Sequence, residues 1–424
     1  MNMTKQSYGT EVYSIAGGGE LLVAQTAAKD VVSVEGSVFG GSNHVPRHWD
    51  VIPELSAQLL DAGTRKKDKD VIRGSLADRG ITLSFSCTGD RTYFSGQCLP
   101  EDLPFLLSII VECLGESSFP EAEVTSAKSR ALGTIAELKT DTSVQAGIAL
   151  SRALYDAEHA NFSRTLEEQE MSVRKTDRAR LMDFRRRLGR DGLVLAIAGD
   201  VYAKSVHAAA EKAFSKLPER GLATVAKPAN QKGSASSEKY IPIADKANVD
   251  VLLGAALPLR KLDPLFHPAS LLIDMLGGGF ASHLMQTIRE RDGLTYGIYA
   301  ALRGFGDGAD GYMRIWATFS PEMFAKSAEA LRKELRHFFA HGMKETALAR
   351  KKEEVTGSYL VGLSTTRGFA RALHQLTIDG RDLSYLAKYP DYIRAVSLAE
   401  VRRAADLVRL DKLAFVASGT FPEK

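Results

Sequence analysis

The apolar residues of this chain follow two spacings, one typical of strands and one typical of helices. Residues 11–38 alternate and are rich in valine, which predicts two or three strands around the Gly17-Gly18-Gly19 turn. Alternation also predicts strands at 81–86 and 92–99, 249–257 and 314–319, and continuous apolar runs predict buried strands at 191–201 and 413–419. Helical spacing predicts helices at 51–62, 70–78, 102–114, 143–157, 205–217 and 345–360, and after Pro120 and Pro321. Ser320 and Ser397 are the predicted helix caps, the latter in a capping box with Glu400.

The order of these elements occurs twice. Leu193–Gly199, LVLAIAG, resembles Leu413–Gly419, LAFVASG, and each run follows a basic helix. Between the two copies the sequence is rich in proline, glycine, serine and lysine, which is typical of a linker. We therefore predict an α+β fold of two homologous α/β-sandwich halves, each a mainly antiparallel sheet packed with helices. The halves are residues 1–220 and 241–424, with the linker at 221–240.

Composition narrows the function classes. The 424 residues are enough for two sizeable cores, and a formal net charge of +3 indicates neither a nucleic-acid partner nor a strongly acidic one. No run of about 18 apolar residues predicts a membrane span. The polar first residues, MNMTKQSYGT, lack the apolar core of a signal peptide, so we expect a cytoplasmic protein, or a periplasmic one if a leader was removed. Three cysteines without metal-ligand spacing predict free thiols.

The most informative stretch is Leu276–Ala300, LGGGFASHLMQTIRERDGLTYGIYA. A glycine run predicts a sharp turn, Ser282 a helix cap, and the apolar spacing that follows a helix ending at Asp292-Gly293. Leu294–Tyr299 is predicted to be a strand. Arg289 then lies in the last helical turn and Tyr296 early in the strand, where a guanidinium and a phenol could bind one carbonyl oxygen or oxyanion.

This stretch resembles the second-half signature of pitrilysin/insulinase-type metallopeptidases, the family with an inverted zinc motif. The resemblance covers essentially the whole chain and implies a duplicated, clam-like arrangement. In that family an Arg and a Tyr with this spacing serve a zinc site on the other half. Arg289 and Tyr296 match them, so the resemblance implies catalytic and substrate-binding roles for both.

The zinc motif itself is degenerate. The family carries His-x-x-Glu-His on a helix shortly before Gly-Thr, where two histidines bind the metal and the glutamate is the general base. Here Glu54 and Gln58 stand in place of the histidines and Ala57 in place of the base, and Glu137 matches the third ligand. We therefore expect no metal or other cofactor in this chain and no peptide hydrolysis by the chain alone.

The resemblance thus implies the non-zinc subunit of a heterodimeric or heterotetrameric zinc metallopeptidase. Its partner would be a homologous subunit that carries His-x-x-Glu-His and binds the zinc, and its substrate an unfolded peptide. Two other hypotheses remain open. The chain could be an inactive structural or peptide-binding protein of the same fold, like the core subunits of respiratory complexes, or an isolated peptide-binding protein without a partner.

Overall fold

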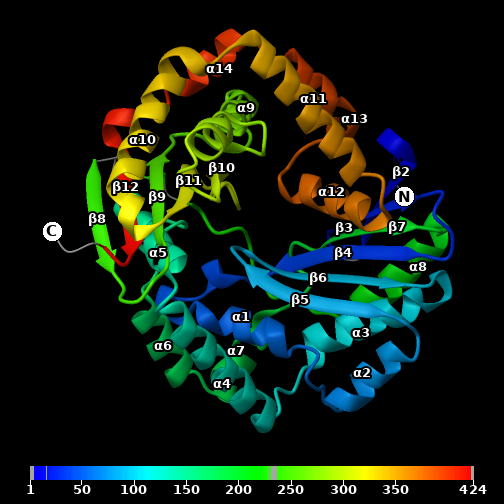
Figure 1. Cartoon of the computed structure of the whole chain (residues 1–424). Helices are drawn as coiled ribbons and strands as arrows, with labels where there is room; N and C mark the ends of the chain where they lie inside the picture. The colour runs from blue at the N-terminus through cyan, green and yellow to red at the C-terminus, as the bar shows by residue number, and fades with distance from the viewer. Residues whose placement is uncertain (1–3, 16, 228, 231–235, 422–424) are drawn as a thin grey trace. The chain divides into compact units, whose positions relative to one another are not determined.

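The computed structural model describes residues 4–15, 17–227, 229–230 and 236–421, and it divides into two compact units (Figure 1). Unit one comprises Met1–Gly133, Glu167–Ala226 and Ser358–Tyr389. Unit two comprises Thr134–Leu166, Lys227–Gly357 and Pro390–Lys424. Neither unit is one continuous piece of chain, because residues 134–166 and 358–389 each belong to the unit built mainly from the other half.

Unit one contains a 7-stranded sheet with the order β1-β2-β3-β7-β4-β6-β5. β3 pairs with β7 in parallel, and the other neighbours are antiparallel. The strands are β1 (Thr4–Gln6), β2 (Thr10–Ile15), β3 (Gly19–Gln25), β4 (Val32–Phe39), β5 (Thr82–Thr88), β6 (Arg91–Cys98) and β7 (Val194–Gly199).

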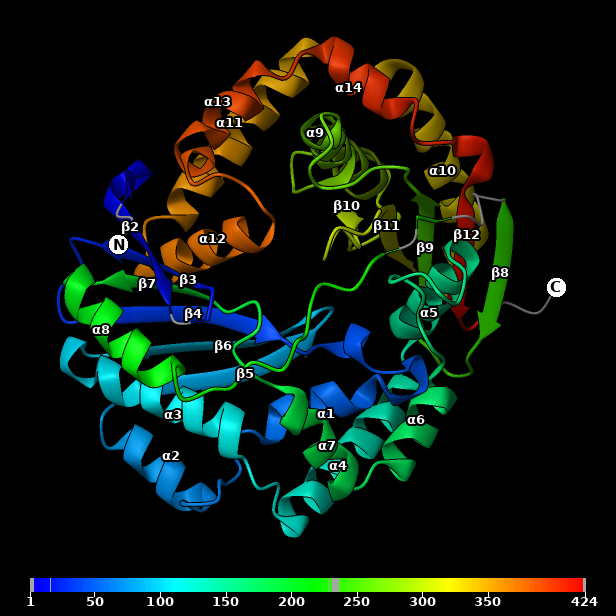
Figure 2. The same ribbon diagram turned by 180° about the vertical axis from the view of Figure 1, so that it is seen from behind.

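Alternate residues of the central strands supply two separate cores. Leu21 and Val23 of β3 face a core shared with α3 (Leu103–Glu116) and α8 (Ala203–Phe214). Their neighbours Leu22 and Ala24 face a second core on the other side of the sheet, where α12 (Thr366–Ile378) packs. Figure 1 and, from behind, Figure 2 show α12 on one face of this sheet and α3 and α8 on the other. Strands buried on both faces read as continuous apolar runs, which is why β7 is apolar throughout.

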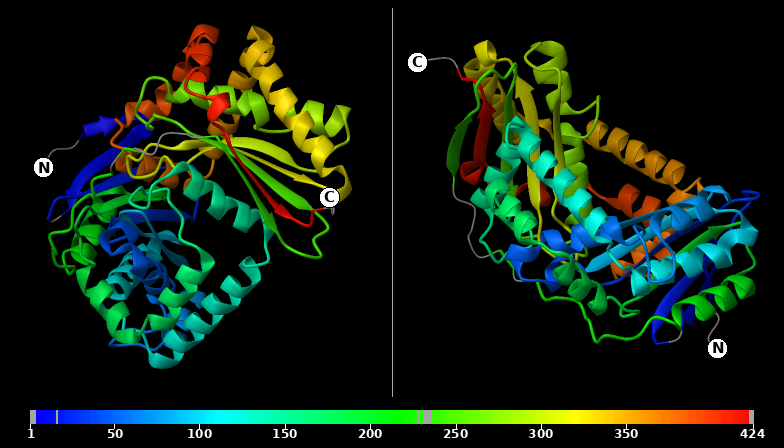
Figure 3. Two further views of the ribbon diagram at one scale, coloured as in Figure 1. Left: turned by 90° about the vertical axis from the view of Figure 1, so that its left-hand side faces the viewer. Right: turned by 90° about the horizontal axis from the view of Figure 1, so that it is seen from below.

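Unit two contains a 5-stranded sheet with the order β10-β11-β9-β12-β8. β12 pairs with β8 in parallel and with β9 antiparallel, and the left view of Figure 3 shows it in red between the two green strands. The strands are β8 (Ser237–Pro242), β9 (Val249–Ala256), β10 (Ile298–Arg303), β11 (Tyr312–Phe319) and β12 (Ala414–Gly419). One face is covered by α5 (Thr142–Leu154), whose Leu150 and Leu154 pack with Leu252 and Val416. α9 (Phe266–Gly277) packs against β10 and α14 (Leu398–Ala405).

The other helices connect or cover these layers. They are α1 (Val51–Leu59), α2 (Lys69–Ala77), α4 (Glu121–Leu138), α6 (Leu166–Lys175), α7 (Arg178–Arg187), α10 (Phe324–His337), α11 (Glu345–Gly362) and α13 (Ser384–Ala395). In the described part of the chain, no helix combines the length and apolar character needed to cross a bilayer.

The predicted fold class is confirmed: each unit is a mainly antiparallel sheet packed with helices. The predicted linker at 221–240 is shorter in the structure, because β8 begins at Ser237 and pairs with β12. Linker residues 228 and 231–235 lie outside the described residues. The homology of the halves 1–220 and 241–424 stays a prediction.

Candidate functional site

The stretch 276–300 lies in unit two and contains two turns around a short helix. α9 ends at Gly277, residues 283–291 are helical, and the segment η5 (Met285–Arg291) has π-helical hydrogen bonding. The amide of Asp292 accordingly bonds to the carbonyl of Thr287, five residues earlier, at 3.0 Å. The predicted helix is confirmed, and Arg289 lies in its last turn. π-helical turns are rare overall, and those that do occur are often found at functional sites.

The strand after this helix begins later than predicted. The expectation was a strand from Leu294, but β10 starts at Ile298. The reason is that the amide of Leu294 bonds back to the carbonyl of Ile288 at 3.0 Å, which folds the chain under the helix before it can enter the sheet. Tyr296 therefore lies on a turn rather than in a strand.

The glycine run is required by its surroundings. A β-carbon on Gly277 would lie 2.3 Å from the backbone nitrogen of Ala300, so α9 and β10 pack too closely for any side chain there. Gly279 has φ +112°, which only glycine adopts without strain. The expectation that Ser282 caps the helix is wrong, because its hydroxyl donates to the carbonyl of Gly279 at 2.6 Å instead of accepting from a helical amide.

Two side chains fasten the helix of Arg289 to α10. Arg291 donates to one carboxylate oxygen of Glu334 at 2.8 Å, and the ring of His283 lies 2.9 Å from the other. Burial acts to raise the pKa of Glu334, but the hydrogen bond and charge of Arg291 outweigh it and leave that pKa lowered. Burial lowers the pKa of His283, and the hydrogen bond and negative charge of Glu334 partly offset this lowering. The helix is thus held at both ends by one buried carboxylate.

Tyr296 projects away from the protein. Its side chain is 93% exposed, whereas its neighbours Leu294 and Thr295 are buried. On the other side Gly297 packs against the indole of Trp316, where a β-carbon would come within 2.9 Å. The buried neighbours fix the turn, and the phenol is left free to bind a group from outside.

Arg289 is half-buried and makes only weak contacts. Its guanidinium carbon lies 5.9 Å from the ring centre of Phe280, its Nη1 lies 3.7 Å from the sulfur of Met285, and its Nε lies 3.5 Å from the carboxylate of Glu290. No hydrogen bond joins Arg289 to Tyr296 within the described ranges of the chain. Most of the guanidinium donors are therefore available to a ligand.

Phe280 is a further candidate that the sequence analysis missed. It follows the glycine run directly, and its ring is 76% exposed beside Arg289. The available signal was an aromatic residue that fits neither the helical spacing before it nor the spacing after it.

The segment predicted to be a degenerate zinc motif lies on α1 of unit one. Glu54 and Gln58 are exposed one helical turn apart, and Ala57 is buried. Glu137 is exposed on α4, in the part assigned to unit two. These residues do not fit a catalytic zinc ion: an amide oxygen is a poor zinc ligand, and a methyl side chain cannot accept a proton. Across the described residues, no group of three or more His, Cys, Asp or Glu side chains is arranged to hold a metal.

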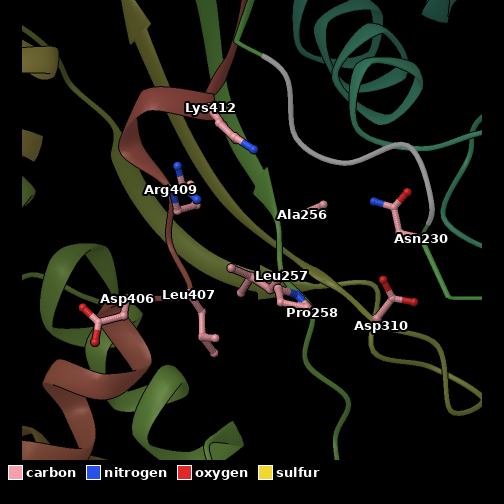
Figure 4. Close-up of a pocket in the computed structure, with 9 residues that line it drawn as sticks. All are labelled: Asn230, Ala256, Leu257, Pro258, Asp310, Asp406, Leu407, Arg409 and Lys412. Carbon is pink, nitrogen blue, oxygen red and sulfur yellow. The ribbon is translucent and has the colours of Figure 1, made fainter.

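A hollow of about 350 Å³ lies elsewhere in unit two (Figure 4). Two of its charged residues are paired with other side chains: Arg409 with Asp411 at 3.0 Å, and Asp310 with His159 at 3.1 Å. Among the residues that the structure describes, those bordering it are Asn230, Ala256, Leu257, Pro258, Asp310, Asp406, Leu407, Arg409 and Lys412. None of them belongs to 276–300, so the hollow is not part of the candidate site.

Comparison with known proteins finds similar sequences and structures. Residues 175–355 match the family described as the peptidase M16 inactive domain. The chain is 25% identical over 411 residues to an uncharacterised zinc protease of Streptomyces coelicolor, covering 90% of this chain and 85% of that protein. It is 22% identical over 375 residues to the non-peptidase homologue YmxG of Helicobacter pylori, covering 85% of this chain and 82% of that protein.

Solved structures show the same fold. The crystal structure of a peptidase M16 inactive domain from Pseudomonas fluorescens superimposes with a TM-score of 0.88 at 20% identity, over 100% of this chain and 99% of that one. The periplasmic protease PqqL of Escherichia coli superimposes with a TM-score of 0.83. The superposition covers 100% of this chain and 46% of the PqqL chain. Residues 175–355 are thus similar to the peptidase M16 inactive domain, and the whole chain has the fold of the solved structure of that domain.

Proposed function

We propose that this chain is the non-zinc subunit of a two-chain M16 metallopeptidase and supplies Arg289 and Tyr296 to a zinc site on its partner. The observation that carries the proposal is the 93% exposure of Tyr296 on a turn in which the two preceding residues are buried. A tyrosine kept only for packing would turn its ring inward, because burying an aromatic ring is favourable by about 1.5–3 kcal/mol.

The need for a partner follows from the degenerate motif. Gln58 and Ala57 leave this chain without a zinc ligand set and without a general base. The fold of this chain also corresponds to only 46% of PqqL, so a longer relative contains a further region of comparable length. We infer that a homologous subunit with His-x-x-Glu-His takes the place of that region and binds the zinc.

The two residues have complementary chemistry. The partner's zinc and glutamate would supply the attacking water. Tyr296 donates its phenolic hydrogen to the oxyanion that forms on the scissile carbonyl, and Arg289 holds the substrate backbone or the same oxyanion by charge-assisted hydrogen bonds. β10 follows Tyr296 directly and is an edge strand of its sheet, so it offers unpaired backbone groups to an extended, unfolded peptide.

The test is peptide cleavage by this chain mixed with a candidate sibling subunit that carries the zinc motif. Neither chain alone should cleave. Tyr296→Phe should lower the turnover of the mixture by roughly 10²-fold, as loss of an oxyanion donor does. Tyr202→Phe is the matched control, because Tyr202 is another tyrosine with a highly exposed ring, 77%, and lies in unit one.

Unchanged turnover in Tyr296→Phe would remove the phenol from the mechanism. Hydrolysis by the purified chain without a companion would contradict the division of labour.

The second candidate function is an inactive structural or peptide-binding protein of the same fold. It is favoured by the match to an inactive domain and to a non-peptidase homologue. This function predicts a stable complex with a partner, or with peptide, in which Tyr296→Phe changes nothing and no cleavage occurs.

A further inference from the structure

The turn that joins α9 to the helix of Arg289 displays an aromatic ring to solvent. Phe280 is 76% exposed, and the residue after it, Ala281, is exposed as well. Leaving a phenylalanine in water forgoes burial worth about 1.5–3 kcal/mol. An exposed ring on a loose loop would need no explanation, so the rigidity of this turn decides whether the exposure is meaningful.

Each of four consecutive carbonyl groups in this turn receives a hydrogen bond from a side chain. Two donors come from α11, one from the helix of Arg289, and one from Ser282, which immediately precedes that helix. The pairs are Lys351 to Gly278 at 2.8 Å, Ser282 to Gly279 at 2.6 Å, Gln286 to Phe280 at 2.8 Å and Arg350 to Ala281 at 2.9 Å. These four hydrogen bonds restrict the conformations that the turn can adopt.

The strongest of these anchors is Lys351. Its side chain is 5% exposed, and its ammonium group also pairs with Glu354 at 2.8 Å. Asp274 of α9 lies in the same buried environment, which raises its pKa to about 6, although the charge of Lys351 opposes the rise. A buried ammonium group that lost its carbonyl partner would be strongly destabilised, so Lys351 and the turn stabilise one another.

We propose that Phe280 is a specificity-determining residue that binds a large apolar side chain of the substrate peptide, next to the bond held by Arg289 and Tyr296. The proposal rests on the function proposed above and names the substrate class: peptides with leucine, phenylalanine or methionine close to the cleaved bond. The guanidinium of Arg289 lies 5.9 Å from the ring, so a lysine or arginine side chain of the substrate would meet a like charge there.

The experiment uses the mixed complex and a peptide series. In each peptide one leucine replaces alanine at one of four positions around the cleaved bond. The wild type should cleave one of the leucine peptides about 10-fold or more faster in kcat/KM than the alanine peptide, a selectivity typical of an apolar subsite. Phe280→Ala should remove this preference, so that the ratio of kcat/KM between the leucine and alanine peptides falls to about 1, and Phe280→Leu should retain part of it. Tyr202→Ala, which removes an exposed ring in unit one, should retain all of it.

A second measurement needs no partner. Fluorescence anisotropy of labelled peptides with this chain alone should show tighter binding of the preferred leucine peptide, and Phe280→Ala should equalise the two. The melting temperature of each variant is measured in parallel, and Phe280→Leu covers the case in which the alanine variant fails to fold.

The outcomes separate this inference from the proposed function. If Tyr296→Phe slows all peptides but Phe280→Ala leaves the leucine preference intact, or slows all peptides equally, then Phe280 does not set specificity while the proposed function stands. If Tyr296→Phe has no effect, the proposed function fails. A leucine preference in the anisotropy measurement that Phe280→Ala removes would then still support a peptide-binding role for Phe280.

Discussion

At the scale of single residues, buried polar contacts join α12 to the sheet of unit one. Nε2 of His374 lies 2.9 Å from the hydroxyl of Ser37 on β4, and Arg91 donates to the same hydroxyl oxygen at 2.9 Å. Because Arg91 uses an acceptor site of that oxygen, the hydroxyl proton is free to point at Nε2, which then accepts as an unprotonated nitrogen. Burial, and to a lesser extent the charge of Arg91, lower the pKa of His374 to about 3.

This histidine should make stability depend on pH. Since its pKa is about 3 in the folded state and about 6.5 when unfolded, the unfolded chain binds more protons below pH 6.5. The contribution of neutral His374 to the free energy of unfolding is therefore complete above pH 6.5 and is lost progressively as the pH falls toward 3. From pH 7.5 to 5.5 the expected loss in free energy of unfolding is roughly 1.4 kcal/mol, measurable by urea titration at both pH values.

The matched pair of variants is His374→Gln and His341→Gln, the second at an exposed histidine. His374→Gln should be less stable at pH 7.5 and should show a smaller loss between the two pH values. An equal pH dependence in wild type and His374→Gln would show that other groups cause it.

At the scale of elements, two serines that both follow the pattern of a helix cap behave differently. Ser397 accepts from the amide of Glu400 at 3.2 Å, and the carboxylate of Glu400 accepts from the amide of Ser397 at 2.7 Å, so the predicted capping box is confirmed. Ser320 precedes Pro321 in the pattern of a cap but makes no side-chain cap bond, because the chain forms a short 3-10 turn before α10 begins at Phe324.

These serines provide an internal control for cap strength. Ser397→Ala should lower the free energy of unfolding by about 1 kcal/mol, because the amide of Glu400 loses its acceptor and the carboxylate of Glu400 loses the hydroxyl of Ser397. Ser320→Ala should change it by a few tenths of a kcal/mol at most, about the size of an ordinary surface substitution. Both are read from the midpoint of urea unfolding, and equal effects would show that the capping box adds nothing measurable.

At the scale of the whole molecule, each unit is completed by a segment from the other half. α5 covers one face of the sheet of unit two, and α12 covers one face of the sheet of unit one. The two contacts are alike: Thr142 at the start of α5 donates to Asp250 on β9, and the hydroxyl of Thr366 at the start of α12 bonds to that of Ser33 on β4 at 2.9 Å. This likeness is what a duplicated fold would produce.

Splitting the chain between residues 226 and 227 should therefore leave two fragments that cannot fold separately. The first would expose the apolar face that Phe369 and Leu373 cover, at about 1.5–3 kcal/mol for each such side chain. Expressed together, the fragments should associate into a folded complex that elutes as one species and unfolds cooperatively. A first fragment that alone gives a sharp unfolding transition and a monomeric elution volume would contradict this prediction.

The sequence by itself determined the kinds of element and the candidate stretch. Periodicity is a local property, so the helices at 345–360 and 102–114 and the buried run at 413–419 could be predicted within a few residues. The presence of Glu54, Ala57 and Gln58 where the resemblance places two zinc ligands and the general base is likewise readable without coordinates. The roles of Arg289 and Tyr296 came from a resemblance and stay predictions.

Only the tertiary structure decided what depends on contacts between distant residues. The exposure of Phe280 and the anchoring of its turn by Lys351 depend on packing and on groups that lie far apart in the sequence. The start of β10 at Ile298 instead follows from a local bond between Leu294 and Ile288, which the residue types do not reveal. The assignment of α5 and α12 to opposite units has the same origin. An amphipathic helix specifies that it must cover an apolar face, but the shape of the completed fold selects which face it covers.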